Sequence, residues 1–146
     1  MDSKVSSLRK PGADARPTVV QPEGWPRPKG YANGMLAEGR VLVTGGIIGW
    51  DEHGAFPPGF VGQATQVFHN IRTILAAGGA APEHLVRLTW YVVDMDEYAA
   101  NLRAIGKSYR GVFGAHYPAM AVVQVVRLLE PAARLEIEAT AVIPSA

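Results

Sequence analysis

The sequence contains no cysteine. A disulfide, a catalytic thiolate and a thiolate-bound metal are therefore excluded. No apolar run approaches the roughly 20 residues that a membrane-spanning helix needs. The first residues carry charges with no apolar segment behind them, unlike a secretory signal. These absences predict a cytoplasmic protein with no membrane partner.

Several signatures of catalytic and cofactor sites are missing as well. There is no Gly-x-Ser-x-Gly nucleophile elbow, no Walker loop for phosphate and no dinucleotide-binding fingerprint. The histidines His53, His69, His84 and His116 do not follow the spacing of metal ligands. We therefore expect neither a cofactor nor a metal.

The charges are distributed unevenly along the 146 residues, although the net charge is only +1. Residues 1–30 hold six Lys/Arg and three Asp/Glu, which gives +3, whereas residues 31–146 hold eight and ten, which gives −2. A nucleic-acid-binding domain concentrates positive charge on its folded surface. The acidic balance of residues 31–146 therefore disfavours nucleic acid as a partner.

What the chain does contain is typical of a single globular domain, with 48% hydrophobic and 18% charged residues. Residues 1–30 hold five of the 11 prolines and few periodic apolar positions, which predicts an irregular N-terminal arm. Residues 31–146 then form one continuous patterned unit. We expect two β-strands first, at 35–37 and 40–44, joined as a hairpin through Glu38-Gly39. Gly45-Gly46 follows and allows a bend or a close approach of the backbone.

Two amphipathic helices are predicted among the remaining strands. The first runs from Phe60 to Leu75, with apolar residues at spacings of three and four, and ends at Gly78-Gly79. A strand at 85–93 precedes Asp94, which begins the second helix with Glu97 in a capping-box-like position. The apolar stripe of that helix consists of Tyr98, Leu102, Ile105, Tyr109 and Val112. Strands at 119–128 and 134–142 complete an α+β domain of order β-β-α-β-α-β-β, with both helices on one sheet face.

The strand from Met120 to Val126 is apolar on nearly both faces. One layer of two helices covers only one face of a sheet, so the other face requires a partner. Such a strand could also lie deep inside a monomer, but two helices are too few to cover both faces. The pattern favours an oligomer.

A series of short motifs in this order resembles the RidA/YjgF family from Pro28 to Ile143. The motifs are Lys29-Gly30-Tyr31, Val41-Leu42-Val43-Thr44-Gly45-Gly46, Gln63-Ala64, Asn70-Ile71, Val92-Val93-Asp94-Met95, Tyr117-Pro118-Ala119 and Leu135-Glu136-Ile137-Glu138-Ala139. The resemblance implies a chorismate-mutase-like subunit in a homotrimer, with helices outside, a barrel of sheets inside and clefts between subunits. It also implies hydrolysis of small enamines and imines to keto acids and ammonia.

The resemblance assigns a role to several positions. Glu136 matches a glutamate that positions water or moves a proton, and Tyr31 matches a tyrosine that lines the cleft. Val122 and Gly46 match positions that contribute main-chain contacts to the substrate, and Tyr91 matches an aromatic position near the cleft. The family's arginine, which binds the substrate carboxylate, corresponds to Met120 here. A thioether provides a soft apolar wall in place of a forked permanent charge.

Each position also has a purely structural interpretation. Glu136 and Glu138 lie two apart on a predicted strand and could be a solubilising pair, and we interpret Glu138 in that way. Met120 could fill a gap in the core or an interface, or could line a pocket adapted to an apolar group. Arg127 is expected on the strand face opposite Met120. An arm residue such as Arg27 or Lys29 could restore the missing positive charge.

The sequence therefore predicts a Rid-type hydrolase with a small-molecule substrate, in which Glu136 activates water and Met120 replaces the anchoring arginine. The alternative is a trimer of the same fold that binds a small ligand without turnover. Endoribonuclease activity, sometimes attributed to the family, is disfavoured by the acidic domain and by the lack of a His or Lys catalytic constellation.

Overall fold

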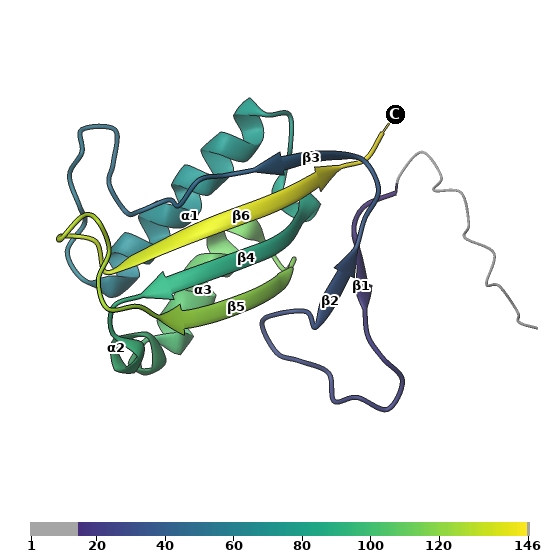
Figure 1. The fold of residues 1–146 in the computed structure, drawn as a ribbon, viewed down its shortest axis with the longest axis horizontal. Helices are drawn as coiled ribbons and strands as arrows, with labels where there is room; N and C mark the ends of the chain where they lie inside the picture. The colour runs from purple at the N-terminus through teal and green to yellow at the C-terminus, as the bar shows by residue number, and fades with distance from the viewer. Residues whose placement is uncertain (1–14, 146) are drawn as a thin grey trace, which may run out of the picture.

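Four strands form the main sheet of the computed structural model, which describes residues 15–145. They are β3 (Arg40–Val43), β6 (Leu135–Ile143), β4 (Leu85–Val92) and β5 (Ala119–Gln124), side by side in that order (Figure 1). β6 runs antiparallel to both of its neighbours, whereas β4 and β5 are parallel. The α+β architecture expected from the sequence is confirmed.

Both long helices pack on the same face of this sheet, as expected (Figure 1). α1 (Phe60–Ala77) buries a stripe of side chains at helical spacing, namely Phe60, Gln63, Ala64, Val67, Phe68, Ile71 and Leu75. Its end lies where the two glycines predict it: the Gly78 N–H donates to the carbonyls of Ile74 and Leu75, and Gly79 has φ +79°. The positive φ explains why glycine is favoured at position 79.

The second predicted helix forms as two segments, α2 (Met95–Ala100) and α3 (Leu102–Phe113), with a break at Asn101. Asp94 caps α2, because its carboxylate accepts hydrogen bonds from the N–H groups of Asp96 (2.9 Å) and Glu97 (3.2 Å). The Glu97 side chain does not complete a capping box and forms an ion pair with Arg134 at 2.7 Å. The predicted apolar stripe is therefore not buried along its whole length: Ile105 and Tyr109 are buried, whereas Leu102, next to the break, is 53% exposed.

The N-terminal strands differ from the prediction. β2 (Gly34–Leu36) pairs with β1 (Thr18–Val20) in a separate two-stranded sheet, and β3 pairs with β6. The predicted hairpin between 35–37 and 40–44 is therefore wrong, because the Glu38-Gly39 turn carries the chain from one sheet to the other. β1 also lies inside the range predicted to be irregular; its Thr-Val-Val composition favours a strand. Residues 1–14 of the predicted arm lie outside the described residues.

The strand predicted at 119–128 ends at Gln124. At this end β5 pairs with β4, which ends at Val92, and the last link between them is the hydrogen bond from Val125 N–H to the Val92 carbonyl (2.9 Å). The chain beyond has no strand to pair with, and Val126 and Leu129 are fully exposed. Arg127 therefore lies in a loop, so the prediction that places it on a strand face is wrong.

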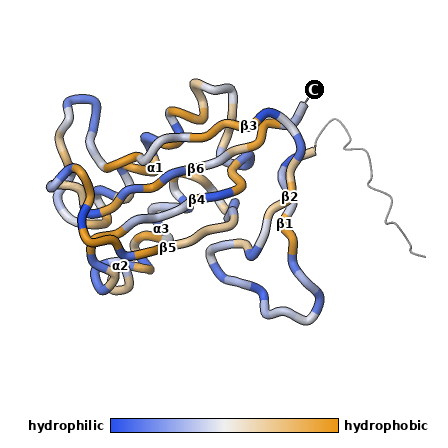
Figure 2. The backbone as a smooth tube through the Cα atoms, viewed as in Figure 1, coloured by the Kyte–Doolittle hydropathy of each residue, from blue (hydrophilic) through white to orange (hydrophobic). Residues whose placement is uncertain are grey.

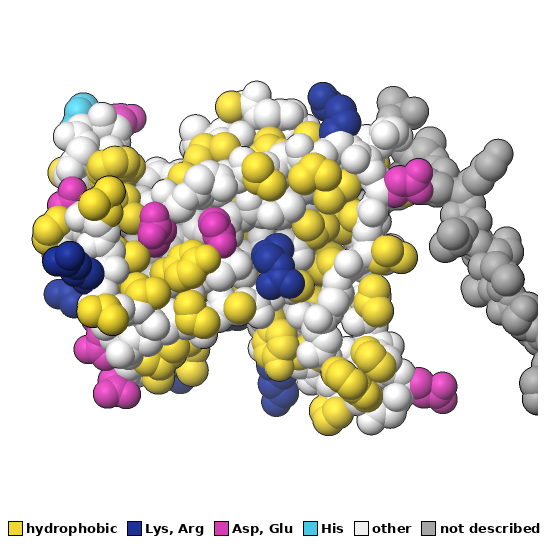
Figure 3. All heavy atoms as spheres, viewed as in Figure 1, with side chains coloured by type: hydrophobic (Ala, Val, Ile, Leu, Met, Phe, Trp, Pro, Cys, Tyr) yellow, Lys and Arg dark blue, Asp and Glu magenta, His cyan; other side chains and the backbone are white. Residues whose placement is uncertain are grey.

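The sheet has one face packed against the helices and one face open. From Leu135 to Ala141 the residues of β6 alternate between buried and partly exposed, and Figure 2 shows the hydropathy along the strand. On the open face, Val41, Val43 and Val123 are 67%, 67% and 43% exposed. Figure 3 shows apolar side chains over this face with acidic side chains between them. Apolar surface of this kind is typical of a face that packs against another molecule.

Among residues 15–145, no helix is long and apolar enough to cross a membrane.

Replacing Asp94 with Ala removes the acceptor for two N–H groups of α2, so we expect the free energy of unfolding per subunit to fall by about 1 kcal/mol. Urea unfolding at a fixed protomer concentration measures the loss, since oligomers gain apparent stability with concentration. Asp94→Asn is the matched control, because its side-chain oxygen caps nearly as well. An equal loss in Asp94→Asn would contradict the capping role.

Candidate functional site

The residues that the sequence predicts for the site lie on two sides of the sheet. In the register of β4 with β6, Tyr91 is opposite Glu136, and both project to the open face. In the register of β4 with β5, Leu88 is opposite Met120 and Trp90 is opposite Val122, which places these side chains on the helix side. Within one subunit the sheet thus separates Glu136 from Met120.

Gly46 lies directly against the Glu136 side chain. The segment after β3 continues beside β6: Thr44 N–H donates to the Ala139 carbonyl, and Ile47 and Ile137 exchange two hydrogen bonds, all at 2.9 Å. A Cβ atom placed on Gly46 would overlap the Glu136 carboxyl group, whereas one on Gly45 would meet nothing within 4 Å. The close backbone approach that the glycine pair predicts therefore occurs at Gly46, and what approaches is the candidate catalytic carboxylate.

Tyr91 is hydrogen-bonded to the other carboxylate of β6. Its hydroxyl donates to Glu138 Oε1 at 2.7 Å, and this hydrogen bond is the main cause that raises the pKa of Tyr91, with desolvation and the negative charges of Glu138 and Glu136 adding to it. The phenol therefore remains protonated at neutral pH. Tyr91 is opposite Glu136 in the strand register, but its polar partner is Glu138, the residue that sequence reasoning treats as structural.

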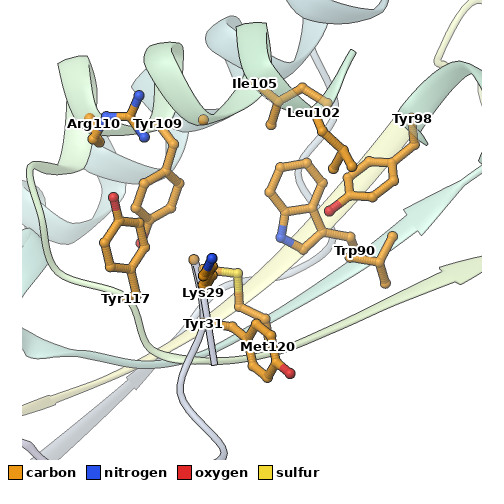
Figure 4. A pocket seen from close by; sticks show the side chains of 13 residues that line it. Lys29, Tyr31, Trp90, Tyr98, Leu102, Ile105, Tyr109, Arg110, Tyr117 and Met120 are labelled. Carbon is orange, nitrogen blue, oxygen red and sulfur yellow. The ribbon is translucent and has the colours of Figure 1, made fainter. Parts of the chain in front are cut away.

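On the helix side, Tyr31, Met120 and Val122 line one pocket of about 630 Å³ between α3, the β4–β5 edge and the segment 29–31 (Figure 4). This volume lies within the range of small-molecule pockets. Among the described residues that line it, Lys29 and Arg110 carry charge and none is acidic. The pocket therefore brings together three of the predicted site residues and the arm lysine.

Aromatic side chains form the deeper walls of this pocket. Trp90 meets Tyr98 edge to face with ring centroids 5.7 Å apart, and Tyr109 stacks on Tyr117 at 5.3 Å. Tyr109 is further fixed by its hydroxyl, which donates to the His116 carbonyl at 2.6 Å. Burial raises the pKa of both Tyr98 and Tyr109, so both rings present neutral phenols.

Trp90 contributes one unsatisfied polar group to this apolar setting. It is 3% exposed, and within residues 15–145 its indole Nε1 is the buried side-chain polar atom that lacks a hydrogen-bond partner. In Figure 4 the indole nitrogen faces the interior of the pocket. Buried donors are normally paired, so an unpaired one in a pocket wall marks a place for an acceptor. Sequence reasoning missed this, because alternation along β4 predicts only that Trp90 and Tyr91 face opposite sides.

Two amide side chains of α1 hold the loops around Glu136 in place. Gln63 is 4% exposed; its Nε2 donates to the Ala132 carbonyl at 3.0 Å and its Oε1 accepts from the Arg134 N–H at 2.9 Å. Asn70 Nδ2 donates to the carbonyls of Ile48 (3.1 Å) and Trp50 (2.9 Å). These residues fix the start of β6 and the chain after Gly46. In the sequence, Gln63 could have been found as the polar residue at a position that belongs to the apolar stripe of α1.

No group of three or more His, Asp or Glu side chains within the described residues is arranged to hold a metal ion.

The fold and this pocket define an α+β sheet protein with a pocket of small-molecule size at the sheet edge. Residues 26–143 match the protein family described as endoribonuclease L-PSP. The chain belongs to this family, which is also known as the Rid/YjgF family.

Relatives and solved structures agree with this assignment. The chain is 32% identical to a RutC family protein of Pyrococcus horikoshii over 84% of this chain and 95% of that protein. It is 29% identical to the 2-iminobutanoate/2-iminopropanoate deaminase of Escherichia coli K12, over 77% and 86% of the two chains. The crystal structure of YyfB from Yersinia pestis, a conserved Rid protein of unknown function, is 31% identical and superposes with a TM-score of 0.77, covering 88% of this chain and 99% of that one.

A solved relative with a ligand is E. coli TdcF with bound serine, which is 27% identical and has a TM-score of 0.63, over 87% and 99% of the two chains. The chorismate-mutase-like Rid fold implied by the resemblance is thereby confirmed.

Gly46→Ala tests the contact with Glu136. We expect a loss of up to about 1–3 kcal/mol in the free energy of unfolding, because the new methyl group overlaps the Glu136 carboxyl group, which has to move aside. In a Glu136→Ala background the obstructing carboxyl group is absent, so the same substitution should cost markedly less. Chemical denaturation of the four proteins in this double-mutant cycle gives the coupling. Additive losses would contradict the contact, and Gly45→Ala is the control that should remain nearly neutral.

Proposed function

We propose that this protein is a Rid-type hydrolase that acts on an imine, an enamine or a related labile bond of a small molecule. In this proposal Glu136 positions water, Tyr31 lines the cleft, and Gly46, Val122 and Tyr91 complete its walls. The observation that supports it most directly is the position of Glu136, whose carboxyl group lies so close to Gly46 that a larger residue there would displace it. Membership of a family with relatives named imine deaminases supports the reaction class.

The chemistry requires one well-placed carboxylate. Glu136 accepts a proton from water as the oxygen attacks the C=N carbon, and the carboxylic acid then returns this proton to the nitrogen. The resulting carbinolamine collapses to a carbonyl compound and ammonia, so water is the only co-reactant. An enamine first tautomerises to the imine: its carbon gains a proton and its nitrogen loses one. The groups that resemble the family site then bind and orient the substrate.

We further propose that the working cleft lies between subunits of a homotrimer. Glu136 and Met120 are on opposite sides of the sheet, so one chain alone does not bring them to a common substrate. Met120 is on β5, at the edge of the sheet, whereas Glu136 is on the open apolar face that needs a partner. A cyclic assembly places the β5 edge of one subunit against the open face of the next and covers that face at the same time.

Met120, which corresponds to the family's carboxylate-binding arginine, changes the expected substrate. A thioether wall gives no charge-paired grip on a carboxylate, which favours a less anionic or larger molecule than a small amino-acid-derived enamine. Lys29 lines the same pocket as Met120, so a cation from the arm is available there in a different geometry.

The second candidate is a trimer that binds its ligand without turnover. The observation that favours it is the pocket itself, whose described lining contains no Asp or Glu that could serve as a base. If Glu136 does not reach the neighbour's pocket, the same molecule binds and is released unchanged.

Ammonia release from freshly generated imines and enamines tests the hydrolase. We expect the wild type to hydrolyse neutral or aromatic substrates faster than small acidic ones. Glu136→Ala should lower kcat/KM by about 10²–10⁴-fold, the range typical of general acid–base groups. Met120→Arg should shift preference towards small imino acids.

The control substitution is Glu38→Ala. Glu38 is an exposed carboxylate far from Glu136 in the sequence, so its loss should leave the rates unchanged. Saturable binding with no ammonia from any substrate in the wild type would replace the hydrolase by the binding protein. Full activity in Glu136→Ala would exclude Glu136 as the base.

Mixing variant subunits tests the shared cleft. Glu136→Gln and Met120→Trp each disable one side, so each homotrimer should be inactive. After joint dissociation and reassociation at equal amounts, each interface of a closed three-fold ring combines one intact side from each chain with a probability of about one quarter. We therefore expect about a quarter of the wild-type activity to return. Light scattering checks the trimer, and no recovery in mixed trimers would place the whole site within one chain.

A further inference from the structure

The pocket beside Met120 extends well beyond the residues that resemble the family site. Its deeper part is formed by α3 and by the aromatic side chains of Trp90, Tyr98, Tyr109 and Tyr117. Such a wall offers flat apolar surface to a ring, and its geometry is set by the ring contacts among these side chains. The volume of this pocket is larger than a two- to four-carbon imine needs.

We propose that this pocket binds an aromatic carboxylate, whose ring lies between Trp90 and Tyr109 and whose carboxylate accepts a hydrogen bond from the Trp90 indole N–H. The inference deepens the proposed function, because it gives the class of molecule that reaches the same site, and it rests on that proposal only for the statement that the molecule is a substrate. Binding itself requires no reaction and no contribution from Glu136.

The unpartnered indole N–H identifies the polar contact. Trp90 is almost entirely buried and its Nε1 has no acceptor, so the donor loses hydration without a replacement bond. A carboxylate oxygen in the pocket supplies that acceptor, and hydrogen bonds to ionised acceptors are stronger than neutral ones. The nitrogen faces the interior beside Met120 and Lys29, which places the acceptor on that side of the pocket (Figure 4).

The charges around the pocket favour an anion over a neutral or cationic ligand. Lys29 and Arg110 are in the lining, and no acidic residue among the described residues lines it. Lys29 is in the segment that enters the pocket beside Tyr31, so its ammonium group can approach a carboxylate held by Trp90. A cation on a flexible arm differs from the rigid fork of an arginine, and it tolerates a bulkier acid.

Isothermal titration calorimetry of the full chain with phenylacetate measures this binding. The neutral phenylacetamide and the ringless acetate are the comparison ligands. We expect saturable binding of one phenylacetate per chain, weaker binding of the amide and none of acetate. Trp90→Phe keeps the ring but removes the N–H, and it should weaken phenylacetate binding about tenfold, which corresponds to the loss of one charge-assisted hydrogen bond.

The matched controls lie outside the pocket. Trp50→Phe changes an exposed tryptophan in the same manner and should leave the affinity unchanged, as should Lys107→Met, at an exposed position of α3 that does not line the pocket. Lys29→Met should weaken phenylacetate binding but not phenylacetamide binding. A proton NMR titration adds a direct readout: the indole N–H resonance absent from Trp90→Phe should move downfield when phenylacetate is added to the wild type.

Two results would overturn the inference: no binding of any aromatic acid by the folded wild type, or binding that Trp90→Phe leaves unchanged without a shift of its indole resonance. Glu136→Gln separates this test from the proposed function. A Glu136→Gln protein that binds phenylacetate but hydrolyses nothing supports both proposals. Phenylacetate binding in a wild type with no hydrolase activity on any imine supports the pocket and rejects the hydrolase.

Discussion

The register between β4 and β6 is the constraint on which the rest of the structure depends. It sets Tyr91 opposite Glu136 and Trp90 opposite Ile137, so each strand contributes one row to the helix-covered core and one to the open face. A slip of one residue would exchange the rows and place two carboxylates in the core. Burying unpaired carboxylates is costly, and the alternation along β6 therefore specifies both the core and the seat of Glu136.

This register is supported from both layers. Under the helices, Leu135, Ile137 and Ala139 are almost fully buried against α1 and its neighbours. At the start of β6, Gln63 holds the backbones of Ala132 and Arg134 from α1. On the other edge, Thr44 and Ile47 continue the hydrogen bonding past β3, which brings Gly46 onto Glu136. Gln63 thus fixes the backbone just before Glu136, and Gly46 packs against its carboxyl group.

The sequence predicted best what depends on local periodicity. α1, with its glycine end, and β4, with its alternation, follow from the spacing of apolar residues, and Asp94 caps α2 as its position predicts. The hairpin through Glu38-Gly39 was wrong because turn residues predict a change of direction and not the strand that receives the chain. The overlong strand after Gln124 was wrong for a similar reason: β-propensity continues through Val126, but β4 offers no further backbone to pair with.

For the site, the motifs located the positions but not their arrangement. Alternation alone places Glu136 and Glu138 on one face, yet which face is open, and that Gly46 rests on Glu136, depends on long-range pairing. The separation of Glu136 from Met120 by the sheet is likewise invisible in the motifs, because they are 16 positions apart on different strands. The unpaired Trp90 N–H and its aromatic surroundings arise from residues of β4, α2 and α3 that meet only after folding.

Because the sheet separates Glu136 from Met120, the surroundings of one residue can change without altering those of the other. The open face contains the carboxylate and exposes apolar side chains, whereas the pocket beside Met120 is built within one chain and has no acidic residue among its described lining. A substitution in the pocket, for example at Met120, then changes the pocket without disturbing the packing around Glu136. Conversely, the packing of Gly46 against Glu136 constrains the carboxylate whatever ligand the pocket accepts. In the proposed hydrolase, binding and proton transfer therefore belong to opposite faces of the same sheet, and assembly of subunits is the step that would bring them together.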